Sequence, residues 1–317
     1  MDGSTTHAAE ESVPGRAPTT TGHPGPVLQT CVLLTVTALT YALVSVGAGR
    51  TSVLSTREWF VWRFAASLGV GLAWLMALRS VRDLRPAARR VGTRLTGRDR
   101  LGYALVTAVL VLGVFLFLYN AGQMDRTWQI AHMEGRLAGV VLAVGVTGVP
   151  WVYLLLTTSA TLGRWEPHHR LAGLLESWDV LVRCLTVFAV LVVISLVPTG
   201  ALRALWLAQR GDTDRLADQF PASDVLLYGA FFTVVLAAIT LPVVAAWRTE
   251  ARRLVAHVYP VTTVEDLTDD WDKGRKRLEE VLHLDKGILR NPLTAFTVFT
   301  PLLTSVLAGF VPGLAAS

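Results

Sequence analysis

Seven apolar stretches of about 20 residues each constrain this chain more than any other feature of its sequence. A helix needs about 20 consecutive apolar residues to cross the hydrocarbon core of a bilayer. The stretches are residues 27–48, 59–78, 101–119, 137–159, 184–202, 225–247 and 293–315. The sequence therefore predicts an all-α, polytopic helical membrane protein with about seven transmembrane helices, the first six of which form a bundle over residues 27–247.

The composition agrees with this class. Of the 317 residues, 52% are hydrophobic and only 17% are charged, whereas a soluble domain carries about 25% charged residues. The net charge of +5 does not indicate nucleic-acid binding, because most of the excess lies between two apolar stretches. The chain has 26 Arg but only 3 Lys, and it is rich in Ala, Val, Leu and Gly. This composition is associated with GC-rich bacterial genomes, so we expect a bacterial cytoplasmic (inner) membrane protein.

The basic residues also predict the orientation of the chain. Cytoplasmic segments of membrane proteins carry an excess of Arg and Lys. If residues 79–100 are cytoplasmic, the segments on that side hold 21 Arg and Lys and the three opposite loops hold 7, which predicts a cytoplasmic N-terminus. Eight arginines in this segment are expected to fix the topology and to bind anionic lipid head groups: Arg79, Arg82, Arg85, Arg89, Arg90, Arg94, Arg98 and Arg100.

Two segments outside the bundle differ in character. Residues 1–26 are rich in Pro, Gly and Thr and are interpreted as a disordered cytoplasmic tail. Within residues 248–292, Thr262 and Glu265 fit a capping box, apolar residues recur with a period near 3.5, and Gly287 suits a C-cap. This pattern predicts a cytoplasmic amphipathic helix of about 25 residues.

The C-terminal segment, residues 293–317, has two interpretations. Asn291 and Pro292 suit an N-cap and a first helical position, whereas Pro301 interrupts the apolar stretch that follows. We favour a kinked transmembrane helix, and the alternative is a re-entrant pair of half-helices.

Several residues within the spans are candidates for packing or function. Arg63 is the only charged residue in the seven stretches, and we expect it to snorkel to the membrane interface or, alternatively, to face the bundle as a gate or anion contact. Gly145, Gly148 and Pro150 interrupt the fourth stretch and predict a static kink or, alternatively, a hinge or a break that lines a cavity. A four-residue repeat of small side chains in the second stretch predicts a close helix contact, within one subunit rather than between subunits: Ala65, Gly69, Ala73 and Ala77.

The ionisable residues give little support for catalysis. No Asp, Glu, His or Lys lies in any stretch, which excludes an intramembrane aspartyl protease and a retinal Schiff base and disfavours proton-coupled transport. Glu166, His168 and His169 form the most unusual polar run, and an interfacial loop is preferred there over a metal site that lacks further ligands. We expect no cofactor and no metal.

Three functions remain open. The favoured one is a non-enzymatic scaffold, regulatory or partner-binding membrane component, in which residues 264–288 contact a cytoplasmic protein or a second copy of the chain. Trp271, the largest apolar residue of that stripe, would carry much of the contact. The second is a small-solute permease or an oligomeric pore, because proline-interrupted spans can line cavities. The third is an interfacial lipid-modifying enzyme that uses Glu166, His168 and His169.

Overall fold

The computed structural model describes residues 26–49, 52–92, 96–122, 128–165, 169–209, 219–261, 268–284 and 299–306, and it describes no side chains at 81–92 and 117–122. The helices in these residues are α1 (Pro26–Ser45), η1 (Ser52–Ser55), α2 (Arg57–Gly92), α3 (Gly97–Gly122), α4 (Met133–Thr161), η2 (Leu162–Arg164), α5 (Arg170–Leu207), α7 (Ala222–Val258) and α8 (Asp269–Val281). Residues 299–306 are also helical. The prediction of an all-helical chain is confirmed for the described residues.

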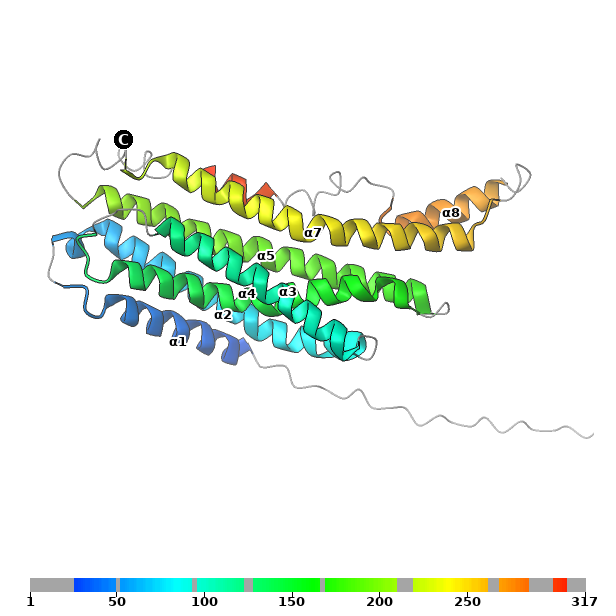
Figure 1. Cartoon of the computed structure of the whole chain (residues 1–317), viewed down its shortest axis with the longest axis horizontal. Coiled ribbons are helices and arrows are strands. Elements are labelled where there is room, and N and C mark those ends of the chain that lie inside the picture. Colours follow the sequence, from blue (N-terminus) through cyan, green and yellow to red (C-terminus); the bar gives the residue numbers. More distant parts are fainter. Residues whose placement is uncertain are drawn as a thin grey trace, which may run out of the picture.

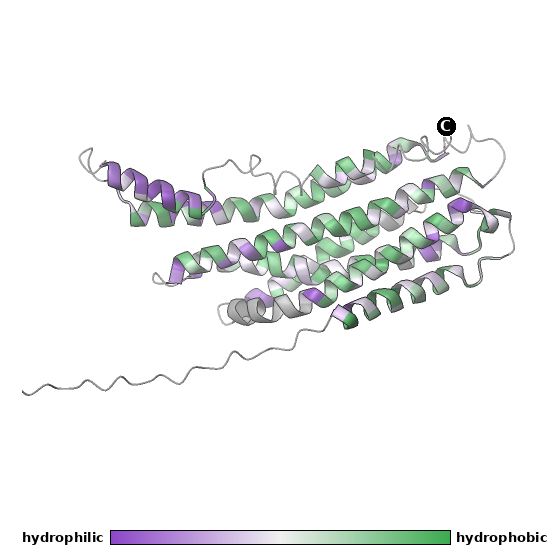
Figure 2. Cartoon of the chain, turned by 180° about the vertical axis from the view of Figure 1, so that it is seen from behind, coloured by the Kyte–Doolittle hydropathy of each residue, from purple (hydrophilic) through white to green (hydrophobic). Residues whose placement is uncertain are grey.

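Six helices in the described chain are long and apolar enough to cross a membrane: α1, α2 over Arg57–Ser80, α3 over Gly97–Leu116, α4 with η2, α5 and α7. They coincide with the first six apolar stretches and run side by side along the long axis of the molecule (Figure 1). Apolar residues cover their middles, and polar residues gather toward the ends (Figure 2). Of the seventh stretch, residues 299–306 belong to the described chain, and the remainder lies outside the described residues.

Several helices extend beyond their apolar stretches. α7 has 37 residues and is therefore about 55 Å long, well over the roughly 30 Å of a bilayer core. α2 continues to Gly92, so the arginines 82 to 90 lie on a helix and not in a connecting loop. Pro150, Pro198 and Pro242 each lie inside a continuous helix, so none of them ends its span.

α2 lies at the centre of the packing. It contacts α1 on one side and α4 and α5 on the other, while α3 packs on α4 and α7 packs on α5. One end of the bundle carries η1 and a cluster of buried aromatic residues that includes Trp59, Trp62, Trp206 and Phe220. We call this the η1 end. The opposite end carries α8, and we call it the α8 end.

α8 is shorter than the sequence predicts. It has 13 residues, and its N-cap is Thr268, whose Oγ1 accepts the backbone N–H of Trp271 at 3.3 Å. The expected cap residues Thr262, Glu265 and Gly287 lie outside the described residues. The helix ends in a turn at His283, which has φ 51°, and the N–H of Leu284 donates to the carbonyl of Glu279 at 2.8 Å. This is a Schellman-type termination, which satisfies the last carbonyls of the helix without a glycine.

The end of α8 is anchored to the bundle. Leu282 is fully buried in the main core, and Leu278 and Leu284 pack against that core. Nη2 of Arg248, on α7, donates to the carbonyl of Leu284 at 3.1 Å. The ring of His283 lies against that of Trp178 of α5 in a tilted arrangement, with centroids 5.7 Å apart. The C-terminal end of α8 is therefore held against α7 and α5 of the same chain, while Val281 stays exposed.

Candidate functional site: a lateral apolar cavity

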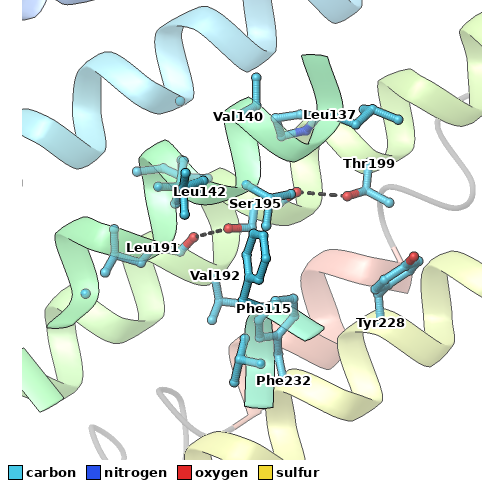
Figure 3. A pocket seen from close by; sticks show the side chains of 18 of the residues that line it. Phe115, Leu137, Val140, Leu142, Leu191, Val192, Ser195, Thr199, Tyr228 and Phe232 are labelled. Carbon is cyan, nitrogen blue, oxygen red and sulfur yellow. Dashed lines mark hydrogen bonds between the residues drawn. The ribbon is translucent and has the colours of Figure 1, made fainter. Parts of the chain in front are cut away.

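A cavity of about 300 Å³ lies among the spans, displaced toward the η1 end (Figure 3). α4 and α5 form much of its wall, and α2, α3 and α7 complete it. The lining residues at the η1 end belong to the aromatic cluster there or pack on it. They are Trp62, Trp128, Leu202 and Phe220. A volume of this size lies at the lower end of the range for small-molecule sites in proteins.

The cavity opens sideways between α3 and α7. Both helices contribute lining residues, such as Phe115 of α3 and Phe232 of α7. Yet α3 packs along α4 and α7 packs along α5, and α3 and α7 are not among the closely packed helix pairs of the described chain. Leu142 and Val146 of α4 line the cavity and are about half exposed, at 52% and 49%.

Glycines of α4 create part of the space. A Cβ atom at Gly145 would meet no other atom within 4 Å, and one at Gly148 would lie 3.6 Å from Cδ1 of Leu191. Both glycines line the cavity. The sequence pattern of these glycines with Pro150 predicts a static kink or, alternatively, a hinge or a break that lines a cavity; Pro150 itself is not among the lining residues.

Few polar groups reach the cavity. The hydroxyl of Ser195 donates to the carbonyl of Leu191 at 2.9 Å, and that of Thr199 donates to the carbonyl of Ser195 at 2.9 Å (Figure 3). These bonds occupy the hydroxyl protons within α5 itself. The indole of Trp128 also lines the cavity, but unlike the two hydroxyls its buried Nε1–H has no hydrogen-bond partner among the described residues.

The chemistry of this lining suits the binding of an apolar molecule. Its described residues include no Asp, Glu, His, Lys or Arg, so it offers no charged ligand for an ion, and its hydroxyl groups are those of Ser195, Thr199 and Tyr228. No group of three or more His, Cys, Asp or Glu side chains in the described part of the chain is placed to hold a metal ion. The cavity therefore matches an uncharged, largely apolar molecule.

Arg63 lies outside the cavity and joins α2 to α1. Its Nη1 donates to Oγ of Ser45 at 2.8 Å, and its Nη2 donates to the hydroxyl of Tyr41. The guanidinium carbon stands 4.0 Å from the ring centroid of Tyr41 and 5.6 Å from that of Trp59. These contacts place the charge in a polar and aromatic setting near the η1 end, where a cation–π contact offsets part of its desolvation.

The small residues of α2 pack inside the chain. A Cβ atom at Gly69 would lie 3.0 Å from Cγ2 of Ile194, on α5. Ala73 is fully buried, and Ala65 and Ala77 are partly buried. The repeat did not point to Gly71, which allows α1 to approach on the other face of the helix, where a Cβ atom would overlap Oγ1 of Thr37.

The other sequence candidates lie apart from the cavity. Glu166, His168 and Arg94 are outside the described residues, and His169 precedes α5 without making a side-chain cap bond. The side chains of Arg82, Arg85, Arg89 and Arg90 are likewise outside the description. Arg79 donates to Oε1 of Gln29 at 3.0 Å, and Arg98 and Arg100 are exposed at the start of α3. Pro150 is partly buried in α4, and Pro301 is buried in the helix 299–306 that packs against Gly229 of α7.

Trp271 packs on its own chain. Its ring meets that of Tyr259 edge-on, with centroids 6.2 Å apart, and the guanidinium of Arg275 stands 5.2 Å from the Trp271 ring centroid. Tyr259 follows the last residue of α7, so Trp271 packs the start of α8 against the end of α7.

The six spans and the apolar cavity between them are those of a multi-pass helical membrane protein. Comparisons of the chain with protein-family models, with curated proteins and with solved structures return no match.

Proposed function

We propose that this protein is a non-enzymatic membrane component that binds the apolar chain of a membrane lipid in the cavity between α3 and α7. The observation that carries the proposal is the cavity itself, which is apolar, lies among the spans and opens between two helices that are not packed together. A lipid chain reaches such an opening by lateral movement, without leaving the hydrocarbon core.

The cavity supports this function better than it supports permeation. A pathway for ions or polar solutes needs polar groups across the membrane, whereas the described lining is almost wholly aliphatic and aromatic. The opening also faces the side of the bundle, between α3 and α7, and not its axis.

Binding of a protein partner through α8 has less support than the sequence suggests. Leu278 of α8 packs on the main core and Trp271 packs on Tyr259, whereas Val281 is 44% exposed. The exposed face of α8 mixes both signs of charge, with Lys276 paired to Asp272 and Arg275 paired to Glu279. We propose two further contacts beside the binding of a lipid chain in the cavity. The charged face of α8 would contact a cytoplasmic partner, and the basic segments at the α8 end would contact anionic lipid head groups.

The orientation and the membrane are part of the proposal. We place the N-terminus and the α8 end in the cytoplasm of a bacterium, on the strength of the 21 Arg and Lys against 7 in the sequence. The cavity, displaced toward the η1 end, then lies in the outer half of the inner membrane.

Photocrosslinking of the full-length protein tests the proposal. The protein is placed in lipid nanodiscs that contain a phosphatidylcholine with a diazirine at the end of one acyl chain, irradiated, and analysed by peptide mass spectrometry. We expect crosslinks at lining residues of α4 and α7. Gly145→Leu places a side chain in open space within the cavity and should greatly reduce these crosslinks.

Gly139→Leu is the matched control. Gly139 lies on the same helix, a Cβ atom there also meets nothing within 4 Å, and the residue does not line the cavity. Both substitutions raise helix propensity equally, so only the filling of the cavity differs. Equal crosslinking of the two variants at the lining residues would refute lipid binding there. A several-fold gain in crosslinking after removal of residues 307–317 would also refute it, because the C-terminus of the chain would then be the occupant.

A further inference from the structure

At the η1 end, one hydrogen-bond donor that lacks an acceptor lines the cavity, and a second lies in the same part of the bundle. The buried indole Nε1–H of Trp128, a lining residue, has no partner among the described residues. The side-chain Nε2 of Gln209 is also buried without a partner, and Gln209 is only 3% exposed. Buried polar groups in native proteins are nearly always hydrogen-bonded, so these two donors indicate a partner that the described residues do not provide.

The two donors lie in one corner of the bundle. Oε1 of Gln209 accepts the backbone N–H of Gln129 at 2.8 Å, and Gln129 is the residue after Trp128. The ring of Trp128 packs edge-on against Trp206 of α5, with centroids 4.8 Å apart. These contacts hold the indole between the segment before α4 and the end of α5, beside the cavity.

A polar contact at this place would decide which lipid is bound. A chain that moves from the bilayer into the cavity exchanges one apolar environment for another, so it gains little hydrophobic free energy. Selection among lipids must then come from shape and from polar contacts. Since Ser195 and Thr199 donate to backbone carbonyls, the Nε1–H of Trp128 is the lining donor whose acceptor is missing.

The donors define the chemistry of the ligand group. An indole N–H and an amide NH₂ only donate, so the complementary group is an acceptor. A phosphate would be desolvated here without a counter-ion, because the described lining contains no Lys, Arg or His. A carbonyl oxygen accepts hydrogen bonds while it stays uncharged.

We infer that the cavity selects lipids with a neutral carbonyl group, an ester or a ketone, whose oxygen accepts the Nε1–H of Trp128 while the attached chain extends between α3 and α7. This inference rests on the proposed function, because it assumes that a lipid chain enters the cavity. It adds the class of ligand and names Trp128 as the residue that recognises it.

Competition with two small probes tests the inference. Methyl dodecanoate carries an ester, and n-tetradecane has a similar length without an acceptor. Each is added to the nanodiscs, and its displacement of the photocrosslinked lipid from the lining residues is measured. We expect half-displacement by the ester at a concentration about fivefold lower than by the alkane, as for one hydrogen bond in a membrane.

Trp128→Phe is the decisive variant, because it keeps an aromatic ring against Trp206 and removes the N–H. We expect it to abolish the preference for the ester while it leaves displacement by the alkane unchanged. Trp74→Phe, at a position that is 40% exposed and outside the cavity, serves as the control and should retain the preference. If Trp128 only supports the fold, Trp128→Phe should reduce displacement by the ester and by the alkane to the same extent.

The outcomes separate this inference from the proposed function. If both probes displace the lipid equally from the wild type, or if Trp128→Phe keeps the preference, the carbonyl inference is wrong. The same holds if water satisfies Trp128, since the ester would then have no advantage. In these cases the effect of Gly145→Leu still stands, whereas the loss of that effect would refute lipid binding as a whole.

Discussion

Gly69 of α2 lies directly against Ile194 of α5: a Cβ atom at position 69 would stand 3.0 Å from Cγ2 of Ile194 and 3.3 Å from its carbonyl oxygen. Glycine lets the two helix backbones approach closely, which replaces the hydrophobic drive that is missing between helices in lipid. Both residues also line the cavity. This close approach of α2 and α5 therefore lies beside the cavity.

The first prediction concerns this contact. Gly69→Val forces a branched side chain against Ile194 and should destabilise the protein by about 1–3 kcal/mol, the usual cost of overpacking. Thermal unfolding in detergent measures the effect. Gly113→Val on α3 is the control, because a Cβ atom there meets nothing within 4 Å. If the two variants unfold at the same temperature, the contact of α2 with α5 contributes little to stability.

The second prediction concerns the opposite face of α2. Gly71→Ala should loosen α1, because the new methyl group would overlap Oγ1 of Thr37 and approach Cδ1 of Leu33 to 3.2 Å. The variant should unfold at a lower temperature than the wild type. Oγ1 of Thr37 is buried and has no hydrogen-bond partner, so Thr37→Ala loses no bond and should partly rescue Gly71→Ala.

A double-mutant cycle over these two positions provides the measurement. We expect the double variant to be less destabilised than the sum of the two single variants by about 0.5–3 kcal/mol, as for residues in direct contact. Additive effects of the two substitutions would mean that the clash is relieved elsewhere, by movement of α1 as a whole.

The spans were predictable because their signal is local. About 20 apolar residues in sequence suffice to identify a span, whatever its neighbours are. The repeat of small residues through Gly69 likewise lies on one helix and predicts a contact. The partner of that contact, Ile194, lies 125 residues later in the sequence, and no pattern within α2 indicates it.

The cavity and the end of α8 were not predictable for related reasons. The cavity exists because α3 and α7 pack on different helices, a property of five helices together that no single segment encodes. α8 ends at His283 although glycine is the usual residue in the left-handed conformation. The packing of Leu282 and Leu284 on the bundle fixes that turn, whereas the sequence pattern pointed to Gly287.

The third prediction tests the docking of α8. Leu282→Ala removes a fully buried side chain and should cost about 2–5 kcal/mol locally, enough to release the end of α8. Limited proteolysis should then cut the region around α8 faster than in the wild type. Val281→Ala is the matched control, since Val281 is the preceding residue and is 44% exposed. Equal cleavage rates in the two variants would show that Leu282 does not hold α8 on the bundle.

The last prediction concerns the orientation of the chain in the membrane, which decides the leaflet whose lipids reach the cavity. In a background of Cys31→Ser and Cys184→Ala, single cysteines replace Ser55 in η1 and Lys276 in α8. Both sites are exposed, and the side chain of Lys276 is 72% exposed. The ion pair of Lys276 with Asp272 is a surface pair, so its loss should cost little stability. In intact cells, a membrane-impermeant maleimide should label the cysteine at position 55 and should reach that at position 276 only after lysis.

This result is expected because the segments predicted to be cytoplasmic hold 21 Arg and Lys and the opposite loops hold 7, and basic segments remain in the cytoplasm. Because Trp128 and the cavity lie toward the η1 end, the carbonyl group of a bound lipid would then sit in the outer half of the membrane. Labelling at position 276 with protection at position 55 would invert the topology. The same cavity would in that case open to the inner half of the membrane, and the lipids of the cytoplasmic leaflet would be its ligands.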